Sequence, residues 1–192
     1  MYLCIDIKEQ MYLSVSSWRE INYPEFRLVN YLLISYTPST PPIKEVILSA
    51  KLRKPFSVLV VIYKKNKDCL LIQRTDDASF WQSVTGGIDE GETPITTAYR
   101  ELLEETGIDA QALGLTICDH QKSNQYTIRE SWRHRYQANA LINTEYVFSI
   151  CVPDDIAITL DPNEHTDFVW LTQQQAAAKA WSPSNRDEIL AL

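Results

Sequence analysis

The chain has 192 residues, 25 of them acidic and 18 basic, and its formal net charge is −7. This length fits one domain with a short extension, and a hydrophobic content of 45% is enough to build a core. The acidic balance argues against a protein that binds nucleic acid through a basic surface, and no apolar run reaches the ~20 residues that span a bilayer.

The four cysteines lie far apart in the sequence, at Cys4, Cys69, Cys118 and Cys151, and form no CxxC pair. A zinc site is therefore not expected, and we interpret these residues as buried free thiols in a reducing cytoplasm. The N-terminus also lacks the basic and apolar regions of a signal peptide, which favours a cytoplasmic location.

Residues 1–50 differ in composition from the rest of the chain. They contain five of the ten tyrosines, no glycine, and a proline-rich stretch at 37–42 that is typical of a linker. Two interpretations stay open: a weakly ordered extension, or translated sequence upstream of the true start. In either case we expect residues 51–192 to form the functional domain.

From residue 51 onward, the pattern of apolar and polar residues indicates a series of strands and helices. The expected strands cover 57–63, 69–74, 80–85, 115–118, 126–136, 145–152 and 167–171. The expected helices cover 94–106, 172–180, with Thr172 as N-cap, and 184–190. Strands separated by one central helix and followed by two others indicate an α/β fold, with a mixed sheet and helices on its faces.

Glycine is scarce in this chain, but four of the five glycines fall within one 22-residue stretch. They are Gly86, Gly87, Gly91 and Gly107. Because glycine permits a positive φ or a close approach of the backbone, this clustering indicates a special loop at 86–92 followed by a helix. Thr93 can cap that helix, and Gly107 suits the position after its last turn.

Acidic residues gather on the central helix and in the loop before it. Glu101 and Glu105 are four residues apart and share one helix face, and Glu104 flanks them. Like charges four residues apart repel each other, and negative charges near the C-terminus of a helix are disfavoured by its dipole. A bound divalent cation is one explanation for the acidic residues, and a solvated acidic face is the other. In the loop, Glu92 is expected to form an ion pair with Arg100, which would orient the neighbouring Glu101.

The complete pattern strengthens the first explanation. Gly86, five residues, Glu92, seven residues and then the run from Arg100 to Ile108 match the Nudix box without a mismatch. The chain therefore resembles Nudix hydrolases, which cleave a nucleoside diphosphate linked to another group. The resemblance implies an α/β/α sandwich with a mixed β-sheet and a loop–helix–loop catalytic motif.

The resemblance also implies the roles of the helix residues. Glu101 and Glu105 are expected to bind Mg²⁺ or Mn²⁺, with Glu104 as a further ligand and Arg100 as a positioning residue. Metal ions at such a site neutralise the phosphates and lower the pKa of a bound water. The carboxylate that acts as general base varies within the family and is not assigned.

Sequence outside the box resembles one bacterial group of Nudix enzymes. The similar segments lie at 73–77, 80–86, 133–136, 181–182 and 185–186. That group hydrolyses 7,8-dihydroneopterin triphosphate to the monophosphate and pyrophosphate, an early step of folate synthesis, and is also described as acting on dATP. The implied partner is thus a small pterin or nucleoside triphosphate, with no nucleic acid and no membrane.

Several residues outside the helix are candidates for contact with this substrate. They are Arg74, Thr85, Trp81, Arg133, Arg135 and Tyr126. The arginines could neutralise a triphosphate or form surface ion pairs, and the aromatic rings could stack on a pterin or pack in the core. By the resemblance, Glu164 is a further metal ligand, whereas His165 and His134 are interpreted as structural.

Two alternative functions stay open at this point. One is a Nudix hydrolase that acts on another nucleotide, such as ADP-ribose or a dinucleoside polyphosphate. The other is a Nudix fold that only binds a ligand. Such modules commonly lose the carboxylates of the box, whereas Glu101, Glu104 and Glu105 are all present here.

Overall fold

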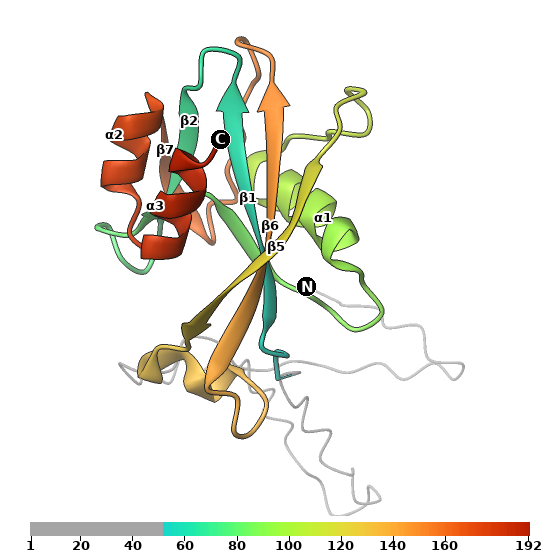
Figure 1. The fold of residues 1–192 in the computed structure, drawn as a ribbon, viewed down its shortest axis with the longest axis vertical. Coiled ribbons are helices and arrows are strands. Elements are labelled where there is room, and N and C mark those ends of the chain that lie inside the picture. The colour runs from blue at the N-terminus through green and yellow to red at the C-terminus, as the bar shows by residue number, and fades with distance from the viewer. Residues whose placement is uncertain (1–51) are drawn as a thin grey trace, which may run out of the picture. The chain divides into compact units, whose positions relative to one another are not determined.

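The computed structural model describes residues 52–192 (Figure 1), and the extension expected over residues 1–50 lies outside them. The strands are β1 (Phe56–Lys64), β2 (Cys69–Arg74), β3 (Trp81–Gln82), β4 (Val84–Gly87), β5 (Cys118–Thr127), β6 (Ile142–Val152) and β7 (His165–Leu171). The helices are α1 (Pro94–Thr106), α2 (Gln173–Lys179), α3 (Pro183–Leu190) and the 3₁₀ helix η1 (Glu130–Arg135). None of the helices in this part of the chain is long and apolar enough to cross a membrane.

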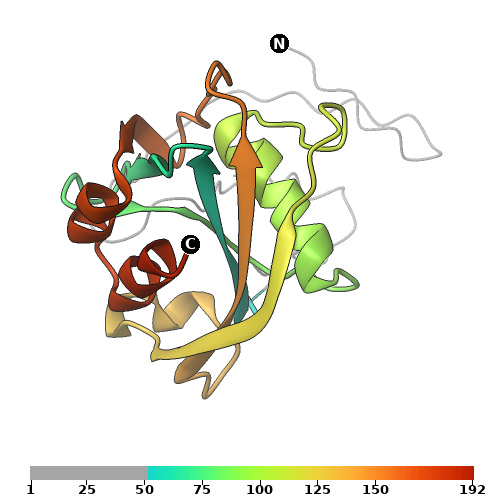
Figure 2. The ribbon, with the colours of Figure 1, turned by 45° about the horizontal axis from the view of Figure 1, so that its top comes forward.

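The strands form one mixed sheet around β1, as expected. Its main path runs β3-β2-β1-β6-β5, while β4 pairs with β1 and β7 pairs with β2. β1 and β6 run parallel along their length, and the other pairs are antiparallel. Helix α1 covers one face and helices α2 and α3 cover the other, so the predicted α/β/α sandwich is confirmed (Figure 2).

The alternation of side chains along β1 builds a core on each face of the sheet. Val58, Val60 and Ile62 point to the face under α1, where they join Leu102. Val61 points to the other face and belongs to the cluster that includes residues of α2 and α3. Because both faces of β1 are covered, its sequence is a continuous apolar run instead of an alternating one.

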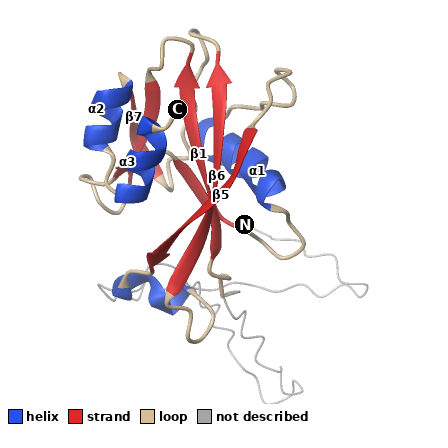
Figure 3. Cartoon of the chain, in the orientation of Figure 1, coloured by secondary structure: helices blue, strands red, loops and turns tan. Residues whose placement is uncertain are grey.

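Two of the expected strands are wrong. In place of strands at 115–118 and 126–136, the chain forms the single strand β5 and then the helix η1 (Figure 3). β5 pairs with β6 alone and most of its side chains are exposed, so its sequence is polar and lacks the apolar period of a buried strand. Residues Glu130–Arg135 of the expected second strand form η1 instead.

The expected strand at 80–85 is also interrupted. It divides into β3 and β4 because the backbone N–H of Ser83 leaves the sheet and donates to the side chain of Asn185, at 2.8 Å. Asn185 returns a hydrogen bond to the Ser83 hydroxyl, also at 2.8 Å. This buried pair ties α3 to the strand that precedes the catalytic loop.

The expectation of buried thiols holds only in part. Cys69 is buried and Cys151 is half-buried, whereas Cys118 is exposed at the start of the edge strand β5. Cys118 was therefore predicted wrongly, for the same reason as the strand that contains it. All three are free thiols, and Cys4 lies outside the described residues.

We expect Asn185→Ala to lower the free energy of unfolding by about 1–3 kcal/mol, because the buried N–H of Ser83 then lacks a partner. Chemical denaturation of both proteins measures this difference. Asn66→Ala serves as the control, since Asn66 makes its side-chain hydrogen bonds within an exposed turn. Its effect should stay within about 0.5 kcal/mol. Equal effects of the two substitutions would contradict the proposed tie.

Candidate active site

Helix α1 has the bounds and the end signals that the sequence predicts. The hydroxyl of Thr93 accepts a hydrogen bond from the N–H of Thr96, and Pro94 occupies the first turn. Gly107 ends the helix with a φ of 72° and donates to the carbonyl of Leu103. Apolar residues of α1, among them Ala98 and Leu102, pack on the sheet. The acidic residues lie beside them, along the side of the helix that faces β4.

The loop before α1 approaches the helix closely at one glycine. A Cβ atom added to Gly86 would lie 1.8 Å from the carboxyl carbon of Glu101. The side chain of Glu101 therefore occupies the space that any other residue at position 86 would need. The neighbouring Gly87 is different, because an added Cβ there would meet its nearest atom, in Arg53, at 3.9 Å.

The guanidinium of Arg100 connects this loop to the helix. It donates to both carboxylate oxygens of Glu92, at 2.8 and 2.9 Å, and to the carbonyl of Gly87 at 3.0 Å. It also donates to Glu101 at 2.7 Å and to Glu104 at 2.9 Å. The hydrogen bonds from Arg100 lower the pKa of Glu92 to about 2. The expected ion pair between Glu92 and Arg100 is therefore present, and it reaches Glu101 as well.

Two carboxyl groups of α1 are buried close to each other. Burial raises the pKa of Glu101 to about 7, and the charge of Glu105 adds to this effect. Glu105 is only 3% exposed, and burial raises its pKa as well. It accepts a hydrogen bond of 3.3 Å from the backbone N–H of Thr85. The third carboxylate, Glu104, has a side chain that is 55% exposed and is held by Arg100.

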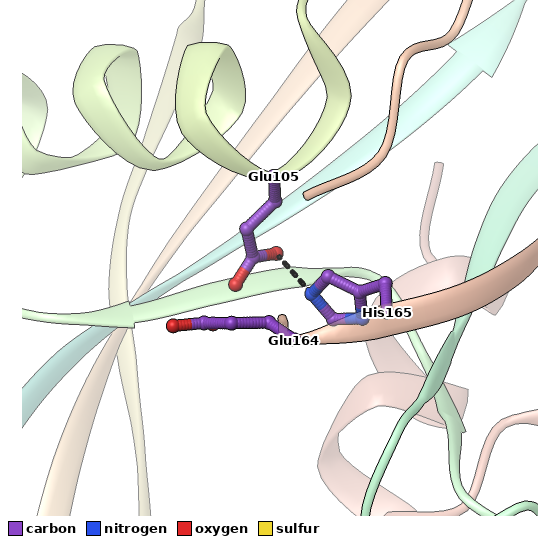
Figure 4. Close-up of side chains that lie close together, drawn as sticks. All are labelled: Glu105, Glu164 and His165. Atoms are coloured by element: carbon purple, nitrogen blue, oxygen red, sulfur yellow. Dashed lines mark ion pairs between the residues drawn. The ribbon is translucent and has the colours of Figure 1, made fainter. Parts of the chain in front are cut away.

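Glu105 meets residues from the start of β7 (Figure 4). One ligand atom each from Glu105, Glu164 and His165 lies within 4.8 Å of the others, so these residues could hold a metal ion. Nε2 of His165 is 3.5 Å from Oε2 of Glu105, and neither ring nitrogen has a hydrogen-bond partner among residues 52–192. Burial lowers the pKa of His165, but Glu105, the backbone of Gln73 and the charge of Glu164 together raise it, so the net shift is upward.

These observations fit a divalent cation. Buried carboxylates with raised pKa values and an unpartnered imidazole are costly to bury without a positive charge. Carboxylate oxygens are the ligands that hard divalent ions prefer. His165, interpreted as structural from the sequence, lies within this group. The signal in the sequence was its position directly after Glu164.

Arg74 lies close to the carboxylates of Glu105 and Glu164. It forms an ion pair with Asp76, at 2.7 Å, and its pKa is raised by that pair and also by the charges of Glu164 and Glu105. Its guanidinium carbon is 5.5 Å from the centre of the Trp132 ring. The structure thus brings Arg74 near the carboxylates, as a residue that contacts phosphates would need to be.

Sequence reasoning missed a second arginine at this place. The guanidinium carbon of Arg129 lies 4.1 Å from the centre of the Trp181 ring and 5.1 Å from that of Trp132. Phe80 stacks on Trp181, with ring centroids 4.4 Å apart. Arg129 belongs to no motif, and only the fold brings it to these rings.

The other candidates are exposed or make their contacts outside the group of carboxylates. Arg133 and Arg135 are exposed on η1. Trp81 packs against the core cluster under α2 and α3, and the amine of Lys179 lies 4.1 Å from the centre of its ring. The hydroxyl of Tyr126, on β5, accepts a hydrogen bond of 3.0 Å from Asn143. The helix carboxylates and Glu164 therefore form the compact part of the site.

Comparison with known proteins agrees with this geometry. Residues 53–192 match the NUDIX domain. The chain is 43% identical over 138 residues to dihydroneopterin triphosphate diphosphatase of Escherichia coli (strain K12), a match that covers 71% of this chain and 91% of that protein. It is 38% identical over 134 residues to the protein of the same name from Haemophilus influenzae, with 69% of this chain and 84% of that protein covered.

A solved structure supports the same relationship. The structure of the E. coli dihydroneopterin triphosphate pyrophosphohydrolase superposes with a TM-score of 0.69 at 42% sequence identity, covering 73% of this chain and 96% of that one. Sequence and fold thus lead to the same family. The chain belongs to the Nudix family.

Proposed function

We propose that this protein hydrolyses 7,8-dihydroneopterin triphosphate to dihydroneopterin monophosphate and pyrophosphate, and that it also accepts dATP. The carboxylate centre formed by Glu101, Glu105 and Glu164 carries the proposal for the reaction type. The substrate is supported by the similarity to the dihydroneopterin triphosphate diphosphatases of E. coli and H. influenzae, which this chain matches over most of their length.

The cation we propose for this centre is Mg²⁺ or Mn²⁺. Glu101, Glu105 and Glu164 would hold it, with Glu104 as a further ligand from the exposed edge of α1. When bound, such an ion neutralises charge on the phosphate oxygens and lowers the pKa of a bound water. The buried carboxylates of Glu101 and Glu105 regain, with a cation beside them, the stabilisation that burial removes from their charged forms.

The remaining residues of the site position these groups and the substrate. Arg100 holds Glu101 and Glu104 at fixed places on the helix, because it is itself held by Glu92. Thr85 orients Glu105 through its backbone N–H. The guanidinium of Arg74, next to the carboxylates, is suited to the negative charge of a triphosphate. Arg133, Arg135, Trp81 and Tyr126 stay candidates for substrate contacts.

Hydrolysis of ADP-ribose or of a dinucleoside polyphosphate is the alternative within the family, and a binding module without activity is the alternative outside enzymes. The complete set of box carboxylates supports an enzyme. The identity of 43% to a dihydroneopterin triphosphate diphosphatase supports the pterin substrate over the other nucleotides.

A substrate panel tests this function. We expect pyrophosphate release with Mg²⁺ from dihydroneopterin triphosphate and, more slowly, from dATP. Equal or faster turnover of ADP-ribose would overturn the choice of substrate. We also propose that residues 51–192 form the catalytic unit, so a chain that begins at Lys51 should give the same order of rates as the full chain.

Removal of one carboxylate tests the metal centre. Glu101→Gln should lower the metal-dependent rate by more than about 100-fold, because even outer partners of metal ligands contribute 10–100-fold. In the metal-free protein the melting temperature should stay equal or rise at pH 8. The pKa of Glu101 is raised in the folded state, so its charge destabilises the fold as the pH passes through about 7, and a neutral amide removes that effect. Glu130→Gln, on the exposed η1, is the control for a lost charge. Full activity of Glu101→Gln would contradict the assignment.

The two adjacent glycines offer a matched pair of variants. Gly86→Ala should displace the side chain of Glu101 and weaken Mg²⁺ activation by at least about tenfold, since the new Cβ needs the space of that carboxyl group. Gly87→Ala should leave it nearly unchanged, because its nearest neighbour is 3.9 Å away. Titration of activity with Mg²⁺ measures both. Identical curves for the two variants would show that the close approach at Gly86 does not matter for the metal.

A further inference from the structure

Two buried acceptor atoms lie on the sheet face opposite the catalytic helix. Asn143 is fully buried and Glu145 is 4% exposed, and both side chains point from β6 to the face that α3 covers. In the part of the chain that the structure describes, the Oδ1 atom of Asn143 and the Oε2 atom of Glu145 have no hydrogen-bond partner. Within residues 52–192, the other unpartnered buried side-chain atoms are the ring nitrogens of His165, which belong to the carboxylate centre.

The orientation of Asn143 is fixed by its neighbours. Its amide nitrogen donates to the hydroxyl of Ser57 at 2.7 Å and to that of Tyr126 at 3.0 Å. Both N–H bonds are therefore used, and the carbonyl oxygen is presented as an acceptor. An unpaired buried acceptor destabilises the fold, so a chain keeps one where a ligand supplies the donor or where a buried water does.

Among residues 52–192, Glu145 forms no ion pair. Burial raises its pKa to about 7, and hydrogen bonds from Ser184, Asn124 and Tyr126 offset only part of that effect. The nearby Glu188, on α3, is buried to a similar degree, at 6% exposure, but has both oxygens paired. They accept from the amine of Lys122 at 2.5 Å and from the amide of Asn124 at 3.0 Å. Glu145 and Glu188 thus lie on the same side of the sheet, but both oxygens of Glu188 accept hydrogen bonds, whereas Oε2 of Glu145 does not.

The register of the sheet connects this pair of acceptors to the catalytic loop. Ser57 on β1 lies opposite Glu145 on one side and opposite Gly87 of β4 on the other. Adjacent strands are about 4.8 Å apart, so the backbone of Glu145 lies about 10 Å from that of Gly87. The carbonyl of Gly87 binds Arg100, which holds Glu101. Over this stretch, only β1 therefore separates the strand that carries Glu145 from the strand that leads into the catalytic loop.

On the basis of the proposed function, we propose that Asn143 and Glu145 determine specificity by accepting hydrogen bonds from the ring of the dihydropterin. The pyrimidinone part of a pterin carries a ring N–H next to an exocyclic amino group, and these two donors match one carboxylate. Adenine places a ring acceptor next to its amino group, so it cannot make the same pair. Tyr126, 37% exposed, is the outward member of the cluster, and its hydroxyl is held by the amide of Asn143.

The substitution Glu145→Gln tests this proposal, because the amide keeps the shape but turns one acceptor into a donor. We expect kcat/KM for dihydroneopterin triphosphate to fall by about 100-fold, mainly through KM, since the ring then faces an unmatched donor. For dATP, kcat/KM should change less than about threefold. The dATP rate and the melting temperature show in the same experiment that the variant is folded.

Glu188→Gln is the matched control, with a similar burial on the same face but with satisfied oxygens, and it should leave the ratio of the two substrates unchanged. A second measurement uses neopterin, which lacks phosphates, and follows the quenching of its fluorescence by the metal-free full-length protein. The wild type should bind it, and Glu145→Gln should bind at least about tenfold more weakly.

The two proposals fail in different ways. If the wild type releases no pyrophosphate from dihydroneopterin triphosphate, the proposed function fails, and neopterin binding still decides on the role of Glu145. If the wild type is active but Glu145→Gln keeps its substrate ratio and its neopterin affinity, the inference about Glu145 alone is overturned. Equal losses on both substrates would also overturn it, because the unpaired acceptors then serve a buried water or the fold.

Discussion

The site depends on the guanidinium of Arg100. An arginine has five N–H donors, and each of the five makes a hydrogen bond here: two to Glu92 and one each to Glu101, Glu104 and the carbonyl of Gly87. One planar group thus joins the glycine-containing loop to two acidic residues of α1. A lysine has the same charge but only three donors and no fixed fork, so it could not hold this arrangement.

The same residues impose a cost on the fold. Glu101 and Glu105 are buried near each other at the C-terminal half of a helix, where the helix dipole disfavours negative charge. Arg100 compensates Glu101, whereas within residues 52–192 Glu105 has only the N–H of Thr85 and the more distant ring of His165. A chain selected for stability alone would place apolar or neutral residues there. The two buried carboxylates therefore indicate a bound cation and a catalytic role.

The parts of the molecule that were predictable have local causes. The bounds of α1 follow from Thr93 and Gly107, and the acidic box has a fixed spacing in the chain. The wrong elements depend on tertiary context: β5 is an exposed edge strand, and the break at Ser83 requires Asn185 from the far end of the chain. The positions of Arg129 and Glu145 were missed for the same reason, since only the pairing of distant segments brings them to their neighbours.

The central strand β1 has one further consequence. Its residue Ser57 has β4 on one side and β6 on the other. Backbone pairing therefore fixes the separation between the catalytic loop and the acceptors on β6 that we propose for the ring of the substrate. Side chains on β6 can then be exchanged without moving the helix that carries the acids. During evolution, the residues on β6 that recognise a substrate can therefore change independently of the acidic residues on α1.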